Sequence, residues 1–283
     1  MLESLIRSLQ AVKSQNTKLE PQTIAVTSPH GSTGKTTVAI NIALELAAEK
    51  FKVLLIDADL EGPSVANYFC LAELPAGLAG SIRIASQHRF DQAQLERLSV
   101  QAPKTSITIL PGVISEQHLE MTSEVVKAIL ETAKASFDFV VLDLGSLRPN
   151  PKKEVFDLTR EIVSIANQVV LVATADPIGI YRLLRIEATI LAITESPKLV
   201  INRLRNSVIA QAKSEIKTTL AGLGTIEVAA FLPDDPVHVD QATRLGMAGG
   251  GRSGSFRSAV GIFTKASILG RQGALDARVA KLG

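Results

Sequence analysis

Residues 27–37 of the sequence read T-S-P-H-G-S-T-G-K-T-T, and this stretch decides the expected fold. It follows the apolar run 24–26 and precedes a segment of helical period that begins at Val38. A glycine-containing loop that joins a strand to a helix and ends in Gly-Lys-Thr is typical of loops whose backbone N–H groups surround phosphate oxygens. The sequence therefore predicts a phosphate-binding loop. The alternative is a Gly-Ser-Thr turn that happens to precede a lysine.

Each residue type in this loop suits phosphate binding for a chemical reason. Glycines let the backbone curl around phosphate oxygens, and the start of the following helix adds positive potential. Lys35 is expected to contact the β- and γ-phosphates, and the Thr36 hydroxyl to hold Mg²⁺. Pro29 has no N–H to donate, but it lies before the phosphate-binding part of the loop. The candidate nucleotide-binding residues of the loop are His30, Gly31, Ser32, Thr33, Gly34, Lys35, Thr36 and Thr37.

Three aspartates follow apolar runs of strand length. Asp57 and Asp59 come after residues 53–56, and Asp143 comes after residues 139–142. One such acid is usually a loop residue or a helix cap, but three of them downstream of a lysine-bearing loop favour a site at the carboxyl edge of a parallel sheet. Mg²⁺ uses few carboxylates, so we expect Thr36, Asp57 and Asp143 to form its surroundings and Asp59 to orient the attacking water. The candidate catalytic residues are Lys35, Asp57 and Asp59.

Strand-length apolar runs alternate with segments of helical period, as in βαβ units. This pattern predicts an α/β fold: a doubly wound, mainly parallel sheet of seven to eight strands with helices on both faces. We expect strands at Thr23–Thr27, Lys52–Ile56, Ser106–Leu110, Phe139–Leu142, Gln168–Ala173, Lys198–Asn202 and Thr225–Phe231. We expect helices at Lys35–Glu49, Ser123–Ser136, Lys153–Asn167, Ile178–Thr194, Ile209–Ala221 and Val237–Leu245.

Composition excludes several classes of protein. The chain has 283 residues, of which 46% are hydrophobic and 20% are charged, as in globular domains. A single cysteine, Cys70, excludes a disulfide framework and any four-cysteine metal site made by one chain. No stretch reaches the roughly 18 apolar residues of a membrane span, and Glu3 and Arg7 interrupt the start of the chain. We therefore expect a cytoplasmic protein.

The two ends of the chain differ from the body. We expect an amphipathic helix at 1–20, a P-loop domain at 21–248, and a flexible hinge with a basic amphipathic tail at 249–283. Between Arg252 and the C-terminus there are six of the 30 basic residues and only one of the 28 acidic residues. The rest of the chain, the body, therefore carries 24 basic and 27 acidic residues. Phe256, Val260 and Phe263 share one helical face. The tail is thus expected to bind an anionic membrane surface or a protein partner, or to pack on its own domain.

The loop, the D-A-D at 57–59 and the strand ending at Asp143 resemble the MinD/ParA family of deviant Walker ATPases. The resemblance covers about residues 23–246. It implies that V-I-N-R at 200–203 and F-L-P-D-D at 231–235 contact the nucleotide base, through Asn202, Arg203, Pro233 and Asp234. Residues 175–184 are most similar to the pilus-associated CpaE/TadZ branch and to septum-site proteins.

The resemblance implies binding of ATP and Mg²⁺, an ATP-dependent homodimer, slow hydrolysis, and a role in placing a septum, a pilus, or chromosome or plasmid cargo. His30 stands where the family keeps a lysine that reaches the partner's phosphate. Histidine is shorter and mostly neutral at pH 7, so hydrolysis is expected to be altered, unless His30 is incidental. The alternatives are an ATP-dependent ligase or amidase of the same fold, and a non-hydrolysing scaffold. Non-specific DNA binding, through arginines such as Arg182 and Arg185, is less favoured because the body is slightly acidic. Attachment at the inner face of the membrane would follow from the tail.

Overall fold

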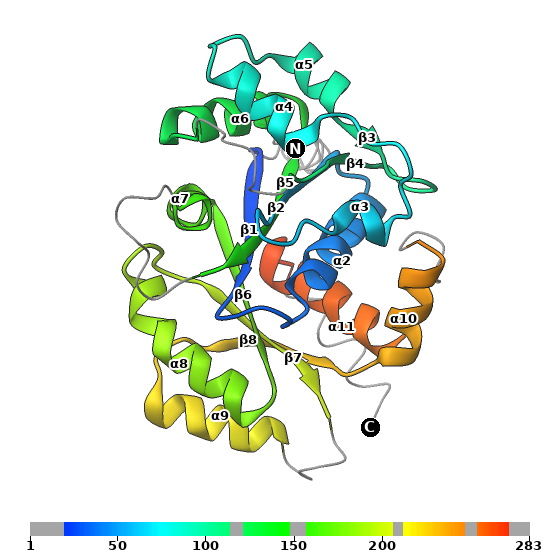
Figure 1. Cartoon of the computed structure of the whole chain (residues 1–283). Coiled ribbons are helices and arrows are strands. Elements are labelled where there is room, and N and C mark those ends of the chain that lie inside the picture. Colours follow the sequence, from blue (N-terminus) through cyan, green and yellow to red (C-terminus); the bar gives the residue numbers. More distant parts are fainter. Residues whose placement is uncertain (1–19, 114–120, 148–156, 206–211, 247–253, 272–283) are drawn as a thin grey trace, which may run out of the picture.

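A computed structural model of the chain describes residues 20–113, 121–147, 157–205, 212–246 and 254–271 (Figure 1). The predicted N-terminal helix therefore lies outside the described residues, apart from its last position. Within the described residues, no helix is long and apolar enough to cross a membrane.

The centre of the molecule is one eight-stranded sheet with strand order β3-β4-β2-β5-β1-β6-β7-β8. All neighbouring strands are parallel except β3 and β4. The predicted doubly wound, mainly parallel sheet is therefore confirmed. The strands are β1 (Gln22–Ser28), β2 (Val53–Ala58), β3 (Val100–Gln101), β4 (Ile107–Leu110), β5 (Phe139–Ser146), β6 (Gln168–Thr174), β7 (Lys198–Leu204) and β8 (Val228–Pro233).

Helices cover both faces of this sheet, as predicted (Figure 1). One face is covered mainly by α2 (Lys35–Ala48) and α11 (Ser255–Phe263), which continues as a π-helical turn η1 (Thr264–Ile268). The other face is covered by α4, α6, α7 and α8. The remaining helices and their bounds are α3 (Val65–Tyr68), α4 (Gly77–Ala85), α5 (Gln92–Leu98), α6 (Ser123–Ser136), α7 (Leu158–Ile165), α8 (Pro177–Leu191), α9 (Ala212–Leu223) and α10 (Pro236–Arg244).

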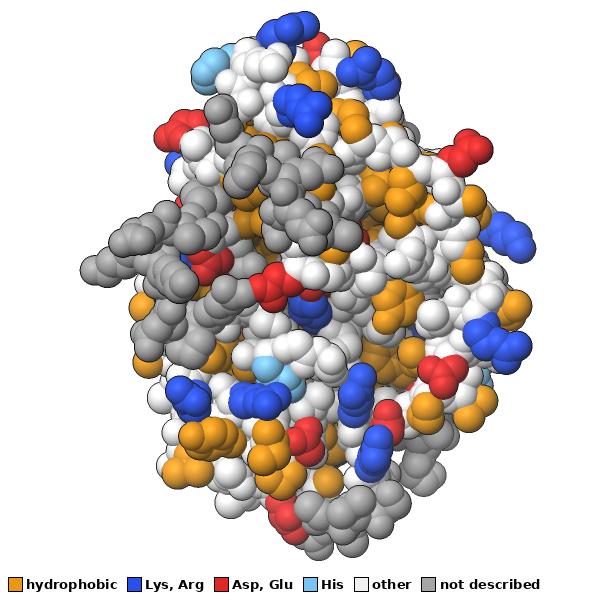
Figure 2. Space-filling model, viewed as in Figure 1, with side chains coloured by type: hydrophobic (Ala, Val, Ile, Leu, Met, Phe, Trp, Pro, Cys, Tyr) orange, Lys and Arg blue, Asp and Glu red, His pale blue; other side chains and the backbone are white. Residues whose placement is uncertain are grey.

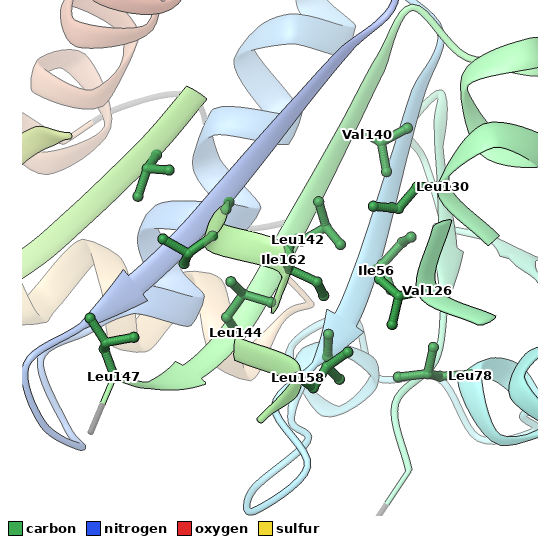
Figure 3. Close-up of a cluster of buried hydrophobic side chains, with 14 of the residues drawn as sticks. Ile56, Leu78, Val126, Leu130, Val140, Leu142, Leu144, Leu147, Leu158 and Ile162 are labelled. Carbon is green, nitrogen blue, oxygen red and sulfur yellow. The ribbon is translucent and has the colours of Figure 1, made fainter. Parts of the chain in front are cut away.

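The central strands are apolar on both faces because both faces are covered. Along β5, Val140, Leu142 and Leu144 point to the side of α6 and α7, where Leu130 and Ile162 meet them (Figure 3). Alternate residues of the same strand, Phe139 and Val141, belong to the core under α2. Two cores on one sheet hold the strand ends in fixed positions, and those ends carry the predicted site.

Two predictions about individual elements need correction. The sequence pattern gave no helix between residues 57 and 105, but α3, α4 and α5 lie there. The strand expected at 225–231 begins only at Val228, because the backbone N–H groups of Thr225 and Ile226 donate to Glu187 Oε1 on α8 and not to a neighbouring strand.

For the first part of the tail expected at 249–283, the structure shows one of the alternatives, packing on its own domain. Phe256, Val260 and Phe263 on α11 are at most 5% exposed and belong to the core under α2. Burial of such side chains stabilises the fold by about 1.5–3 kcal/mol each, so this stripe is not available to a membrane. Residues 254–271 are therefore packed on the same domain as the sheet. The second apolar stripe of the tail, at 275, 279 and 282, lies outside the described residues.

Candidate nucleotide site

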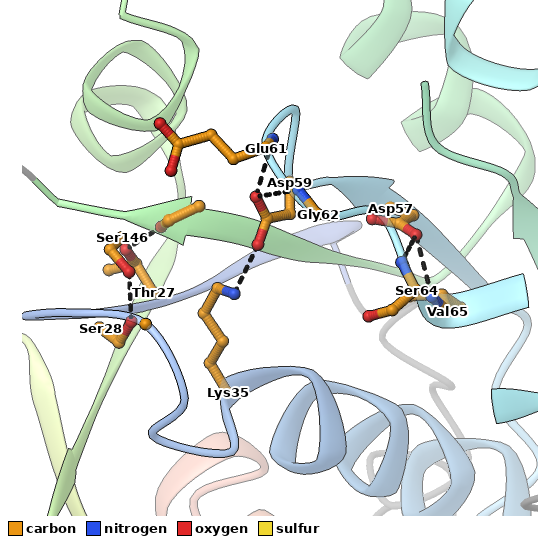
Figure 4. Close-up of polar contacts among 12 residues, drawn as sticks. Thr27, Ser28, Lys35, Asp57, Asp59, Glu61, Gly62, Ser64, Val65 and Ser146 are labelled. Atoms are coloured by element: carbon orange, nitrogen blue, oxygen red, sulfur yellow. Dashed lines mark hydrogen bonds and ion pairs between the residues drawn. The ribbon is translucent and has the colours of Figure 1, made fainter. Parts of the chain in front are cut away.

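The predicted phosphate loop connects the end of β1 to the first residue of α2, Lys35 (Figure 4). Its backbone turns through two residues of positive φ, Ser32 at 63° and Gly34 at 86°. A Cβ atom on Gly34 would lie 2.5 Å from the Asn202 side-chain nitrogen. Glycine is thus required at position 34 both by its conformation and by this close approach.

Lys35 forms an ion pair with Asp59 across the loop. The distance from Lys35 Nζ to Asp59 Oδ2 is 2.6 Å, and the two side chains are only 11% and 10% exposed. The other oxygen of Asp59 accepts hydrogen bonds from the backbone N–H groups of Glu61 and Gly62 at 3.1 and 3.3 Å (Figure 4). The lysine that would bind phosphate and the acid that would orient water are therefore bonded to each other.

Asp57 and Asp143 lie on adjacent strands, paired in register at the ends of β2 and β5. Oδ2 of Asp57 accepts hydrogen bonds from the N–H groups of Ser64 and Val65 at 2.8 and 2.9 Å. Oδ1 of Asp57 and both oxygens of Asp143 are buried and make no hydrogen bond within normal limits. Burial raises the pKa of Asp57 to about 6, although the N–H of Val65 lowers it. Burial also raises the pKa of Asp143 to about 8, although nearby Lys35 lowers it.

These unpaired oxygens fit a magnesium ion. Carboxylate and hydroxyl oxygens are the ligands that Mg²⁺ prefers, and the Thr36 hydroxyl lies close enough to Asp143 to lower the pKa of its carboxyl group. Within the described residues, no group of three or more His, Cys, Asp or Glu side chains could hold a metal by itself. Mg²⁺ usually keeps several waters and binds substrate phosphates, so it needs few protein ligands, and the residues present fit it.

The residues expected to contact the base lie beside the loop, at the ends of β7 and β8. The Asn202 side-chain N–H donates to the carbonyl of Thr33 at 2.8 Å, so Asn202 holds the loop itself. Arg203 has a positive φ of 56° and is exposed. The N–H of Asp234 donates to the carbonyl of Leu204 at 2.9 Å, and its carboxylate pairs with Arg205 at 2.6 Å. The structure thus brings both segments to the same edge as the loop.

His30 lies at the start of the loop, where its Nδ1 is 2.7 Å from the carbonyl of Gly31. It also faces α8. Burial raises the pKa of Asp176, but hydrogen bonds from Thr174 and from the first turn of α8 lower it below its ordinary value, and the charge of His30 adds to this lowering. The Asp176 carboxylate caps α8 by accepting from the N–H groups of Ile178 and Gly179. His30 thus lies on the loop, near enough to the acidic cap of α8 to act on its charge.

Two groups of site residues were missed by the sequence analysis. A Cβ on Gly112 would lie 2.8 Å from Asp57 Cγ, so the backbone after β4 passes close to the Asp57 carboxylate. Ser28 Oγ lies 3.2 Å from Ser146 Oγ and donates to the carbonyl of His30, so the end of β5 touches the start of the loop (Figure 4). A Pro-Gly pair directly after a predicted strand, at 111–112, was the available signal for the first group.

The surface around the site carries both signs of charge. On the face seen in Figure 2, Lys and Arg side chains are interrupted by acidic and apolar ones and do not form one continuous basic surface. Arg205 is neutralised by Asp234. This distribution does not favour non-specific DNA binding, which depends on many unpaired cations.

Comparison with known proteins agrees with this geometry. The family model described as the CobQ/CobB/MinD/ParA nucleotide binding domain matches residues 24–244. A putative septum site-determining protein MinD of Oltmannsiellopsis viridis is 24% identical over 237 residues, which span 80% of this chain and 68% of that protein. MinD of Synechocystis is 25% identical and shares 75% of this chain and 76% of its own length.

Solved structures share the fold. A ParA family ATPase from Chlorobium tepidum has a TM-score of 0.70 at 16% identity, and the match covers 86% of this chain and 98% of that one. MinD in a MinC:MinD complex from Aquifex aeolicus has a TM-score of 0.67 at 21% identity, covering 88% and 96% of the two chains. The comparisons do not support the pilus-assembly branch to which residues 175–184 were compared.

Proposed function

Because the chain belongs to the CobQ/CobB/MinD/ParA nucleotide-binding family, we propose that it binds ATP with Mg²⁺, dimerises around the nucleotide and hydrolyses it slowly. The dimer would control the placement or assembly of a cellular structure. One observation carries the proposal: Lys35, Asp59 and the unpaired oxygens of Asp57 and Asp143 meet at the carboxyl edge of the sheet beside a glycine loop. In open parallel sheets this edge is where ligands bind.

The residues of the site would act in a fixed order. Incoming phosphates compete with Asp59 for the Lys35 ammonium, because both are anions and Lys35 makes one short ion pair. Release from Lys35 leaves one oxygen of Asp59 free to orient a water, while the N–H groups of Glu61 and Gly62 still hold the other oxygen. Mg²⁺, held by the Thr36 hydroxyl with Asp57 and Asp143 around it, would supply charge neutralisation at the phosphates. Asn202 keeps the loop in shape through Thr33.

Dimerisation is supported by an apolar pair beside the loop. Ile178 and Tyr181 lie in the first turns of α8, next to the cap that His30 faces, and they are 60% and 59% exposed. Exposed aromatic and aliphatic side chains beside a ligand site are typical of surfaces that a partner covers. A second copy that approaches the loop from this side would bury both.

The positional role is supported by the relatives. The similar proteins include septum site-determining MinD proteins and a putative plasmid partition protein from Borrelia burgdorferi bound to AMPPNP. We therefore favour a septum or partition type of cargo. We also propose that the protein is cytoplasmic. It would attach to an anionic membrane or to a protein partner through residues 272–283. Deleting these residues tests attachment without removing the buried Phe256 and Phe263.

The mass of the purified protein in ATP–Mg²⁺ and in ADP–Mg²⁺ tests the proposal. We expect a dimer in ATP and a monomer in ADP, and Asp59→Ala should accumulate the dimer because it turns over more slowly. Sedimentation with anionic liposomes, for the full chain and for the chain without 272–283, then tests attachment. An ATP-bound protein that stays monomeric would contradict the proposal.

A non-hydrolysing scaffold is the second candidate, and His30 is the observation that favours it. No lysine is available at that position to reach a partner's phosphate, and the ring is engaged with the carbonyl of Gly31. Phosphate release by the ATP-bound dimer separates the two: a dimer that forms in ATP without releasing phosphate identifies a scaffold.

A further inference from the structure

Asp235 takes no part in the mechanism above, yet it is one of the most constrained carboxylates among the described residues. Its side chain is 9% exposed, and it directly follows Pro233 and Asp234. Oδ1 lies 2.6 Å from His238 Nδ1, while Oδ2 accepts from the Ser255 hydroxyl at 3.0 Å and from the Phe256 N–H at 3.2 Å. Burial raises the pKa of Asp235, but hydrogen bonds from His238, Phe256 and Ser255 lower it to about 2.

This carboxylate serves the starts of two helices. Asp235 is the N-cap residue of α10, where it accepts no capping bond of normal geometry, although the backbone N–H of His238 is close enough to lower its pKa. It also serves the N-terminus of α11, whose own N-cap is Gly254 and has no side chain. A Cβ at Gly254 would lie 2.9 Å from Asp235 Oδ2 and 3.0 Å from His238, and φ is +125° there. Glycine at 254 therefore makes room for a cap that comes from another part of the chain.

A continuous series of contacts leads from the phosphate loop to this cap. Thr33 in the loop accepts from Asn202 on β7. Two residues later, the carbonyl of Leu204 accepts from the N–H of Asp234. Asp235 is the next residue and holds α11. The segment proposed to contact the base is therefore adjacent, in sequence and in space, to the anchor of the C-terminal helix.

The other side of α11 rests on the helix that starts at the phosphate loop. Phe256, Val260 and Phe263 pack in the core under α2, and Arg257 pairs with Glu45 of α2 at 3.2 Å. Further along, Lys265 and Arg271 pair with Glu49. Both the loop helix and the base segment thus hold α11.

We propose that Asp235 is a positioning residue that couples nucleotide occupancy to the docking of α11, with adenine nucleotide at the base segment and α11 stabilising each other. The coupling rests on the proposed nucleotide site. A nucleotide that orders residues 233–235 fixes the carboxylate that caps α11, and by reciprocity a docked α11 favours the nucleotide.

Hydrogen exchange of backbone amides in saturating ADP–Mg²⁺ and without nucleotide tests the coupling. In the wild type we expect nucleotide to slow exchange in the loop, at 33–37, and in α11, at 257–263, by roughly fivefold or more. In Asp235→Asn the loop should still be slowed, but the slowing in α11 should disappear. The amide keeps only one acceptor oxygen, so it cannot accept from both His238 and α11.

Glu49→Gln is the matched control, because it also removes one acid that holds this segment but lies at its far end. It should raise exchange in α11 with and without nucleotide by the same factor, as any merely structural contact would. Ser255→Ala removes one of the two bonds from α11 to Asp235, and we expect it to reduce the nucleotide effect on α11 even if Asp235→Asn folds poorly.

The outcomes separate the two proposals. If nucleotide slows the loop but leaves α11 of the wild type unchanged, or slows α11 equally in the wild type and Asp235→Asn, Asp235 is not a coupling residue. If nucleotide does not protect the loop of the wild type at all, the nucleotide site itself is wrong.

Discussion

The ion pair between Lys35 and Asp59 predicts that Asp59→Asn binds ATP more tightly and hydrolyses it more slowly than the wild type. In the nucleotide-free site, Lys35 has to leave Asp59 before it can contact a phosphate. The asparagine oxygen can still accept from the N–H groups of Glu61 and Gly62, so the local backbone should keep its shape. What is lost is the attraction for Lys35 and the carboxylate that would orient water.

The size of the effect follows from the distance and the burial. At 2.6 Å and an effective dielectric constant of about 20, the Coulomb attraction is about 6 kcal/mol. Desolvation offsets most of it. Exposed pairs contribute about 0–1 kcal/mol, and breaking a fully buried pair costs about 3–5 kcal/mol. Side chains that are 11% and 10% exposed fall between these limits. We take about 2 kcal/mol, which corresponds to about 30-fold in affinity.

Titration calorimetry with ATP in EDTA measures the binding term without the metal. Asp57→Asn is the matched control: it removes a carboxylate from the same D-A-D motif, but Asp57 hydrogen-bonds backbone N–H groups and not Lys35. Its gain in affinity reports the general effect of removing one negative charge beside the phosphates. Turnover is then measured with Mg²⁺, where we expect Asp59→Asn to be the slower enzyme.

Comparing the two variants shows whether Asp59 competes with phosphate for Lys35 and whether it orients water. If Asp59→Asn binds ATP no more tightly than Asp57→Asn does, the pair with Lys35 does not compete with phosphate. If its turnover equals that of the wild type while its affinity rises, Asp59 competes for Lys35 but does not orient water.

Three further predictions follow from the site. The pKa of Asp143 is raised to about 8, so the free energy of unfolding of the nucleotide-free protein should fall as pH rises above about 4, by about 3 kcal/mol between pH 5 and 7. In urea unfolding, Asp143→Asn should show a flatter dependence on pH than the wild type. Parallel pH profiles of the two proteins would contradict the burial argument. Gly34→Ala should weaken nucleotide binding at least about tenfold, because a Cβ there lies 2.5 Å from Asn202 Nδ2 and φ is +86°; unchanged affinity in an equilibrium binding assay would show that the loop adapts. His30→Lys should raise phosphate release, and an unchanged rate would show that His30 is incidental.

Much of this architecture could be predicted because its signals are local. Residues 53–56 and 139–142 are continuous apolar runs since both faces of the sheet are covered, and each ends in the acid that the site uses. The loop was recognisable because glycines, lysine and threonine lie within a few residues of each other. Parallel strands then place all their carboxyl ends at one edge, so the convergence of Lys35, Asp59 and Asp143 follows from topology alone.

The parts that could not be predicted depend on distant partners. The apolar stripe of α11 has the same spacing whether it meets a membrane or its own domain. The core under α2 that buries this stripe is built from distant parts of the chain, and Glu45, which pairs with Arg257, lies 212 positions before it. The bond from the Asn202 side chain to the carbonyl of Thr33 joins residues 169 positions apart, so no local pattern could indicate it. Helix α4 starts at Gly77, whose positive φ and close contact with the Pro111 carbonyl come from packing and not from helix propensity.

The buried carboxylates also bear on whether Pro29 and His30 mark a loop that no longer binds phosphate. Asp143 is fully buried with both oxygens unpaired, and Asp57 has one oxygen in the same condition. Such groups destabilise a fold unless a partner satisfies them. A cation with phosphate is a partner of the right chemistry, and the Thr36 hydroxyl and Lys35 ammonium lie beside the place where it would sit. A protein of this fold that no longer bound nucleotide would be more stable with neutral side chains at positions 57 and 143. The arrangement therefore favours a site that is filled during function, and in the proposed function His30 would act after the nucleotide has bound.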